Sequence, residues 1–452
     1  MKKLYRTLET YAKKAVRSVA FLPVPMITLA VILGFILFSL EKSTGLSKQT
    51  AEWFPALAIT SQDTARTILG MFVGGLITLT VFTFSQIMIL LNQVATSYSP
   101  RLLPKLTGDR SLQFVMGLNL ATIVLTIAVL LSIRSNDNYT IPIFSILTCV
   151  LLGIICLCLF VYFVTAITKK IQVSSIIEAC AKDALRHLEK QCDLEDDGYR
   201  EKGRPDNITN WYAILSPISG YVGSVDYSTL AKLSREYRTR FYLGTRKGEY
   251  IPRGLPLLQS ENRLDEEQVA LVLSAVAPIS DLFDDWYLPN LKQLTEIALK
   301  ALSPGINDPG TALTVIDRQT EVLARMMDVP LYDFYGPEKG GEVYFSRHDY
   351  GEVLRALMME MRAYGKRDPL VVRRLFQMLF HLLELAGDGL SVRRAVEEEI
   401  RGLLADARTF LLNPVDRVAI ARDINHHRLA VRHARRLLKE QNRAIEHAAA
   451  EA

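Results

Sequence analysis

Apolar and polar residues are segregated along this chain instead of being mixed evenly. Four long apolar runs lie before Thr168, and nearly all acidic residues come after it. Each run is long enough for a helix that crosses a bilayer, which takes about 20 apolar residues. The sequence therefore predicts a four-span α-helical membrane domain over residues 1–170, with spans at roughly 19–40, 67–92, 113–133 and 142–168.

The first apolar run is interpreted as a retained span. It follows the segment MKKLYRTLETYAKKAVRS, which carries six Lys or Arg residues. A cleaved signal peptide has a shorter apolar core and a cleavage site of small residues, and neither is convincing here. The first span is therefore expected to stay in the mature protein.

Basic residues are unevenly distributed between the short segments that flank the spans. The N-terminal segment, the 93–112 connection and Lys169-Lys170 are basic, whereas the 41–66 and 134–140 segments are poorer in Lys and Arg. Cytoplasmic flanks carry the excess of Lys and Arg, so both termini are predicted to be cytoplasmic. The net charge of +5 then reflects contact with the lipid bilayer, and no nucleic-acid partner is expected.

The rest of the chain predicts three further parts on the cytoplasmic side. Residues 171–206 read as an amphipathic helix and a polar linker, and residues 207–260 as short strands forming a small β module. The order of turns in that module resembles a barrel-sandwich hybrid, without the lipoylated lysine turn. Residues 261–452 predict a cytoplasmic helical domain, interrupted by a hairpin at 328–348 and ending in a basic helix near 414–447. The predicted class is a mainly α integral membrane protein.

The second span has one flank of small and hydrogen-bonding residues. At about 100° per residue this flank occupies an arc of about 140°. It contains Gly74 and Gly75 together with Thr78, Ser85, Gln86, Asn92, Gln93, Thr96 and Ser99. Helix packing explains such a face, because small residues permit close approach, and Gly70 with Gly74 forms a Gly-xxx-Gly pair. The alternative is that the face lines a pore or path for small ions.

Two basic residues follow this face at its predicted cytoplasmic mouth. Arg101 and Lys105 come directly after Ser99-Pro100. In an oligomer they would form a basic ring that favours anions, whereas singly they would anchor the span at lipid headgroups. Both interpretations stay open at this point.

The segment ALKALSPGINDPGTALTVIDR, residues 298–318, crowds turn-forming residues between two helical patterns. Gly305 is expected to take the positive φ that ends the first helix. Asp308 is expected to cap the second helix, with Pro309 at its first position. The alternative is a ligand site at the helix N-terminus. The corner consists of Ser303, Pro304, Gly305, Asn307, Asp308 and Pro309.

Three segments carry a resemblance to a known family. The corner ALKALSPGINDPGTA, the segment FSQIMILLNQVATSYSPRLL at 84–103, and ISGYVGSVDYSTLAKLS resemble a bacterial membrane-protein family of unknown function, domain of unknown function 2254. The chain departs from the family pattern at 279–290, ISDLFDDWYLPN. The resemblance implies a multi-pass protein of the bacterial inner membrane and implies no activity.

Catalytic and metal-binding patterns are not apparent. The seven histidines lack metal-ligand spacing, and the chain has no phosphate-binding loop and no Gly-x-Ser-x-Gly motif. We therefore expect no enzyme, no cofactor and no metal site. Four spans enclose little volume, so a homo-oligomer is expected, either as an ion channel or permeation protein with a cytoplasmic gate or vestibule, or as a sensor or scaffold that recruits cytoplasmic partners.

Overall fold

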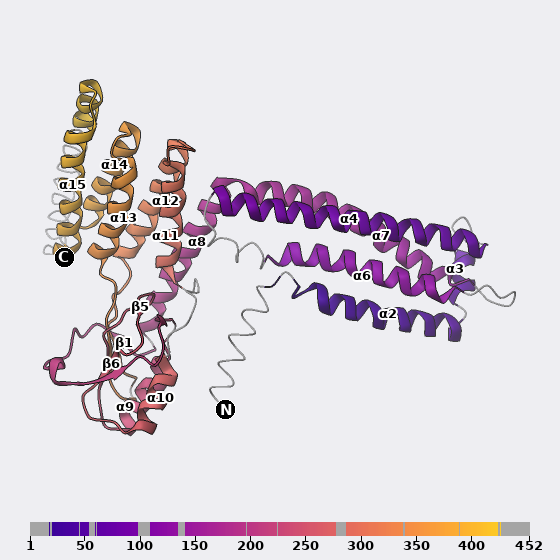
Figure 1. Ribbon diagram of the computed structural model, residues 1–452, viewed down its shortest axis with the longest axis horizontal. Coiled ribbons are helices and arrows are strands. Elements are labelled where there is room, and N and C mark those ends of the chain that lie inside the picture. Colours follow the sequence, from indigo (N-terminus) through magenta and orange to yellow (C-terminus); the bar gives the residue numbers. More distant parts are fainter. Residues whose placement is uncertain are drawn as a thin grey trace, which may run out of the picture. The chain divides into compact units, whose positions relative to one another are not determined.

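The computed structural model divides the chain into two compact units, Met1–Ser175 and Ile176–Ala452. Figure 1 shows the helices and strands of both. The structure describes residues 18, 20–44, 46–53, 59, 61–97, 109–133, 141–195, 197–223, 225–276, 286–337, 340–387, 389–423 and 425.

The first unit contains four helices that are long and apolar enough to cross a membrane, which confirms the four predicted spans. They lie side by side in Figure 1, with the short helix α3 (Leu46–Trp53) at one end. The second span begins earlier and ends later than the apolar run, because its polar ends continue the helix. The four helices are α2 (Pro23–Thr44), α4 (Gln62–Ser97), α6 (Arg110–Ser132) and α7 (Ile143–Ile171).

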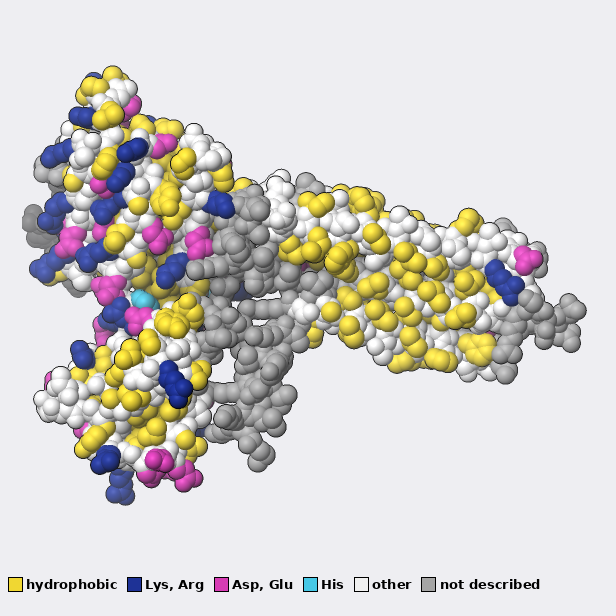
Figure 2. Space-filling view, viewed as in Figure 1, with side chains coloured by type: hydrophobic (Ala, Val, Ile, Leu, Met, Phe, Trp, Pro, Cys, Tyr) yellow, Lys and Arg dark blue, Asp and Glu magenta, His cyan; other side chains and the backbone are white. Residues whose placement is uncertain are grey.

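Helix α6 lies at the centre of this unit. In its apolar window 56% of the residues are buried, against 17% to 33% in the other three helices. Its side chain Leu125 packs with Leu69 of α4 and Ile146 of α7 in one buried cluster. Apolar side chains cover the outside of the unit in Figure 2, as a lipid-facing surface requires.

A carboxylate fixes the start of α7. Proline 142 offers no side-chain cap, and Glu41 of α2 takes that role from across the bundle. Its Oε1 accepts from the Ser145 backbone N–H at 3.1 Å and from the Ser47 hydroxyl at 3.0 Å, and its Oε2 accepts from the Ser145 hydroxyl at 2.8 Å. The negative charge thus sits at the positive end of the α7 dipole.

Helix α8 (Val173–Cys192) follows α7 after Gln172, which has an extended backbone. This is the predicted amphipathic helix. Its apolar flank is buried in the second unit through Ile176, Ile177, Cys180, Ala181, Ala184 and Leu188.

The β module is a six-stranded sheet in the order β1-β7-β8-β4-β6-β2, beside a two-stranded sheet β3-β5. Strand neighbours are antiparallel except β4 and β8, which are parallel. The predicted hairpin at 328–348 is confirmed and supplies β7 and β8. The strands are β1 (Tyr199–Arg200), β2 (Tyr212–Leu215), β3 (Gly220–Tyr221), β4 (Phe241–Leu243), β5 (Tyr250–Ile251), β6 (Pro256–Ser260), β7 (Phe334–Tyr335) and β8 (Val343–Phe345).

The structure does not confirm a barrel-sandwich fold for this module. Helix α9 (Tyr227–Glu236) occupies a stretch for which short strands were predicted. Asp226 caps it by accepting from the Thr229 N–H, and its apolar side chains at helical spacing, such as Leu230 and Leu233, are buried. The sheet also extends beyond the predicted 207–260, because β1, β7 and β8 join it from outside that range.

The remaining helices of the second unit follow the expected helical pattern. Asp368 caps α14 by accepting from the Leu370 and Val371 N–H groups, and Asn413 accepts from the Val415 N–H at 2.9 Å, so each of these Asx-Pro pairs begins a helix. Acidic and basic side chains are interspersed on the face of this unit in Figure 2. The helices are α10 (Glu266–Val276), α11 (Tyr287–Ala301), α12 (Pro309–Met327), α13 (Tyr350–Gly365), α14 (Pro369–Leu385) and α15 (Leu390–Phe410).

Candidate functional site: the exposed flank of α4

Helix α4 buries one flank in the bundle and leaves the opposite flank uncovered. At about 100° per residue, the buried positions fall roughly opposite the predicted polar flank. Leu76, Thr83 and Ile87, which this spacing places opposite the polar flank, are buried. The complete buried flank is Ala65, Leu69, Leu76, Thr83, Ile87, Leu90 and Val94.

The hydroxyl groups of the polar flank bond to their own helix. Thr78 Oγ1 donates to the Gly74 carbonyl and Ser85 Oγ donates to the Val81 carbonyl, both at 2.9 Å. Each exposed hydroxyl therefore keeps acceptor lone pairs directed outward while its proton is engaged. Such hydroxyls tolerate an apolar neighbour and still accept from a polar one.

The amides of this flank lie toward the end of the span. Gln86 is half-buried, and Asn92 and Gln93 are exposed. Thr96 belongs to the helix, but its side chain lies outside the described part of the chain. Ser99, Arg101 and Lys105 also lie outside the described residues, so the predicted cytoplasmic mouth stays a prediction.

The Gly-xxx-Gly pair is not used for packing within the protomer. A Cβ atom added at Gly70, Gly74 or Gly75 would meet no atom within 4 Å in the described part of the chain. Large apolar residues are interleaved with the polar ones on the same flank, including Met71 and Ile89, which are 65% and 58% exposed. The flank is thus a surface of mixed polarity, and its three glycines are not packed against the described rest of the protomer.

The corner between α11 and α12 is a capped helix–turn–helix. Asp308 Oδ1 accepts from the Thr311 N–H at 3.1 Å and its Oδ2 accepts from the Thr311 hydroxyl at 2.6 Å, with Pro309 at the first helical position. These hydrogen bonds hold the pKa of Asp308 below its ordinary value. The Asp308 N–H donates to the Ala301 carbonyl at 2.8 Å, which closes the turn.

The positive φ of the corner belongs to Asn307 and not to Gly305. Asn307 has φ 49°, and Gly305 is absent from the glycines with positive φ. Asparagine tolerates this left-handed region better than other non-glycine residues. Ser303 donates its hydroxyl to the Lys300 carbonyl at 2.6 Å, and its own carbonyl accepts from the Asn307 N–H at 2.9 Å. Pro304 is exposed beside it.

Helices α11 and α12 contact α8 through polar groups that the sequence did not single out. Cys180 Sγ of α8 donates to Gln293 Oε1 of α11 at 3.6 Å. Glu178 of α8 pairs with Arg318 of α12 at 2.6 Å. The corner therefore sets the geometry of two helices that hold α8, the segment following the fourth span.

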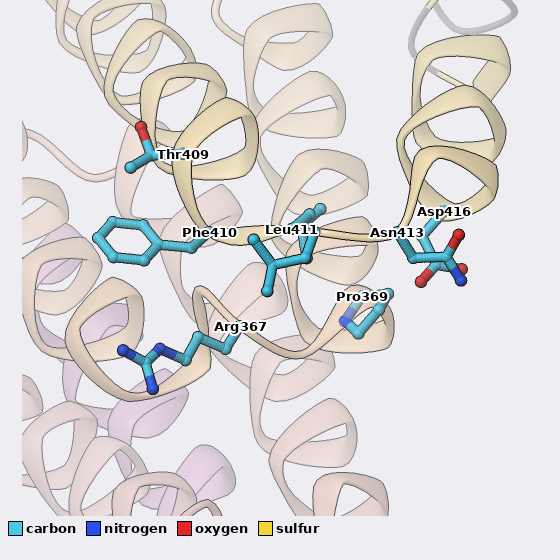
Figure 3. Close-up of a pocket in the computed structure, with 8 residues that line it drawn as sticks. Arg367, Pro369, Thr409, Phe410, Leu411, Asn413 and Asp416 are labelled. Atoms are coloured by element: carbon cyan, nitrogen blue, oxygen red, sulfur yellow. The ribbon is translucent and has the colours of Figure 1, made fainter.

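A surface hollow and the spacing of potential metal ligands show what other ligand sites the described residues offer. A hollow of about 470 Å³ lies where the start of α14 meets the end of α15 (Figure 3). Its lining mixes Phe410 and Leu411 with the opposite charges of Arg367 and Asp416, so it favours no one class of ligand. Among the described residues, no group of three or more His, Cys, Asp or Glu side chains is placed to hold a metal ion.

Residues 16–381 match the family described as "Predicted membrane protein (DUF2254)". The chain belongs to this family. This DUF2254 chain is similar to the uncharacterized protein Rv1290c of Mycobacterium tuberculosis and the uncharacterized protein Mb1321c of Mycobacterium bovis. Each is 25% identical over 369 residues, which cover 79% of this chain and 70% of the relative. No solved structure matches this DUF2254 chain.

The family match includes the three segments that carried the resemblance. The corner, the end of α4 and the ISGYVGSVDYSTLAKLS segment all lie within residues 16–381. Helix α15 lies beyond the match. In the divergent segment 279–290, residues 279–285 lie outside the described part, and the Asn290 side chain donates to the Trp286 carbonyl at 3.1 Å.

Proposed function

We propose that this DUF2254 protein is an oligomeric permeation protein of the bacterial inner membrane, with both termini in the cytoplasm and the α4 flanks of several copies lining a path for small ions. The observation that carries the proposal is the exposure of Thr78, Ser85, Asn92 and Gln93 on a helix long enough to span the bilayer. Hydroxyls and amides gain little from facing lipid tails, whereas water or another protein surface offers them partners.

The glycines of α4 support the oligomer. Association in lipid depends on close van der Waals contact and interhelical hydrogen bonds, which small residues allow. Gly70, Gly74 and Gly75 are uncovered in the described protomer and so remain open to a second copy. A ring of copies brings these flanks together, with the polar positions toward the axis and Met71 and Ile89 interleaved among them.

The second unit is proposed as a gate or vestibule. Helix α8 follows the fourth span after the extended residue Gln172 and is held by Gln293 and Arg318. A displacement of α11 and α12 would therefore be passed to α8. The capped corner gives these two helices a fixed relation to each other, which a mechanical link requires.

A second candidate function is a sensor or scaffold that does not transport. The apolar side chains of Met71, Phe82 and Ile89 on the exposed flank favour it, because a continuous aqueous lining would not need them. In that case α4 joins the copies and the second unit recruits cytoplasmic partners.

Ion flux in liposomes tests the permeation proposal. Purified protein is reconstituted, and wild type is compared with Thr78→Leu and Ser85→Leu, with Met88→Leu as the matched control. Met88 is 51% exposed on the same helix and Leu has a similar size. Permeation predicts that flux falls at least tenfold in the two polar-flank variants, with oligomer size unchanged, and persists in the control. Equal flux in all four proteins would contradict it.

A further inference from the structure

The amide of Asn119 is the least satisfied buried side-chain group among the described residues of the first unit. It lies in α6, is 1% exposed, and neither its Oδ1 nor its Nδ2 has a hydrogen-bond partner among the described residues. Burying an amide without hydrogen bonds is unfavourable, so nearly all buried polar groups in proteins are paired. Gln113, the other buried amide of α6, donates its Nε2 to the Ser18 carbonyl at 2.9 Å. Unlike Gln113, Asn119 has no hydrogen-bond partner among the described protein atoms, so we expect a bound molecule to supply one.

The flank of α6 around Asn119 is a polar seam within the bundle. At about 100° per residue, Thr122 and Thr126 lie within about 60° of Asn119. Thr122 Oγ1 lies 3.4 Å from the Sγ atom of Cys156 on α7, and Thr126 donates to the Thr122 carbonyl at 2.7 Å. Both hydroxyls are thus engaged, and Cys156 has no exposed surface. The seam is polar at a depth where lipid offers nothing to bond to.

We propose that Asn119 binds internal water, one or two molecules held in the seam between α6 and α7. The chemistry of the seam selects the ligand: an amide, hydroxyls and a thiol both donate and accept, and water does the same. An ion would lack a countercharge, because residues 111–133 and 143–168 contain no Asp, Glu, Lys or Arg. A bound water needs two or more polar partners, which the amide and the seam provide.

This site is independent of the proposed permeation function. The α4 flank faces away from the bundle, whereas Asn119 is enclosed within one protomer. A water molecule at Asn119 would lie inside one subunit, and its binding does not depend on whether several copies assemble into a pore. Failure of the flux experiment would leave it untouched.

X-ray radiolytic footprinting of the full-length protein in detergent tests the site. Hydroxyl radicals formed from bound water oxidise the side chains beside it, and mass spectrometry reads the oxidation of each cysteine. Cys180 is the buried reference, since it is 1% exposed and its thiol bonds to Gln293. We expect Cys156 to oxidise at least fivefold faster than Cys180 in the wild type. Equal slow oxidation of both thiols would overturn the proposal, and this comparison needs no variant.

The variant Asn119→Leu sharpens the test, with Thr80→Val as its control. Thr80 is a partly buried hydroxyl on α4 that donates to the Leu76 carbonyl at 2.8 Å. We expect Asn119→Leu to lower Cys156 oxidation at least threefold and Thr80→Val to leave it unchanged. Unchanged oxidation in Asn119→Leu, or an equal fall in both variants, would show that the amide holds no water.

Discussion

Replacing Asp308 with alanine tests whether the signature corner of the family is a structural cap. Asp308 accepts from the Thr311 N–H at 3.1 Å and from the Thr311 hydroxyl at 2.6 Å, and alanine removes both acceptors. Loss of an N-cap costs about 1 kcal/mol. For a unit of this size that corresponds to a fall in melting temperature of about 2 °C. Asp308→Asn keeps an acceptor and should leave the melting temperature nearly unchanged, because asparagine caps helices about as well as aspartate.

Thermal unfolding of the full-length protein in detergent measures this effect. Intrinsic fluorescence reports on the second unit, because Trp211 and Trp286 are two of the three tryptophans of the chain. Surface substitution at an uninvolved position, such as Glu360→Ala, serves as the matched control. An unchanged melting temperature together with lost ion flux would refute the capping account and make Asp308 part of a ligand site.

The stability lost in Asp308→Ala should depend on pH, and the direction of this dependence follows from the pKa of Asp308. The Thr311 hydrogen bonds lower the pKa of folded Asp308 below its ordinary value of 3.8. A depressed folded pKa means that the carboxylate stabilises the fold above pH 3.8 and that this contribution is lost as the pH falls through the folded pKa. The difference in melting temperature between wild type and Asp308→Ala should therefore be constant near neutral pH and narrow below pH 4. A difference that widens on acidification would contradict the assignment.

Four more substitutions have defined outcomes. Gly305→Ala should leave the melting temperature unchanged, since the added Cβ meets no atom of the described chain. Asn307→Ala should lower the free energy of unfolding by about 1 kcal/mol, because residue 307 has a φ of 49° and alanine is disfavoured there. Equal melting temperatures of the two variants would contradict this. Gly365→Ala should lower stability by about 1–3 kcal/mol, because the added Cβ would collide with the buried Val371 side chain; an unchanged melting temperature would contradict this. Glu41→Ala should lower the melting temperature in detergent, since about 1–3 kcal/mol is lost when buried donors lose their acceptor; an unchanged value would show that the carboxylate is dispensable.

The long periodic features of this protein could be predicted from its sequence. The four spans follow from apolar length alone, and the starts of α12 and α14 follow from Asp308-Pro309 and Asp368-Pro369. These depend on local chemistry, and neighbours in space do not alter them. The polar flank of α4 was likewise visible from residue spacing.

Features that depend on contacts between distant segments could not be predicted. The module was expected to be all strand, yet Asp226 starts α9, and strands β7 and β8 come from about 80 residues beyond β6. The capping residue Asp226 and the helical spacing of Leu230 and Leu233 indicated α9, but the strand-like sequence on both sides led to a prediction of strands there. The Glu41 cap of α7 joins residues 104 apart in sequence, so no local sequence pattern predicts it.

The left-handed residue of the corner shows a subtler limit. Glycine is the usual residue at a helix end with positive φ, so Gly305 was the natural choice. The turn instead runs two residues further and closes through the Asp308 N–H to the Ala301 carbonyl. Which residue takes the positive φ depends on that closing hydrogen bond.

The central claim, that the α4 flank meets water in the assembled protein, is tested most directly by cysteine reactivity. Ser85→Cys and Phe84→Cys proteins in liposomes are treated with a charged, water-soluble methanethiosulfonate, and mass spectrometry follows the modified peptide. Both positions are exposed on the protomer, and they lie about 100° apart around α4, so Phe84 is outside the polar flank. The account predicts modification of Ser85→Cys at least tenfold faster than Phe84→Cys. Equal rates at the two positions would contradict it.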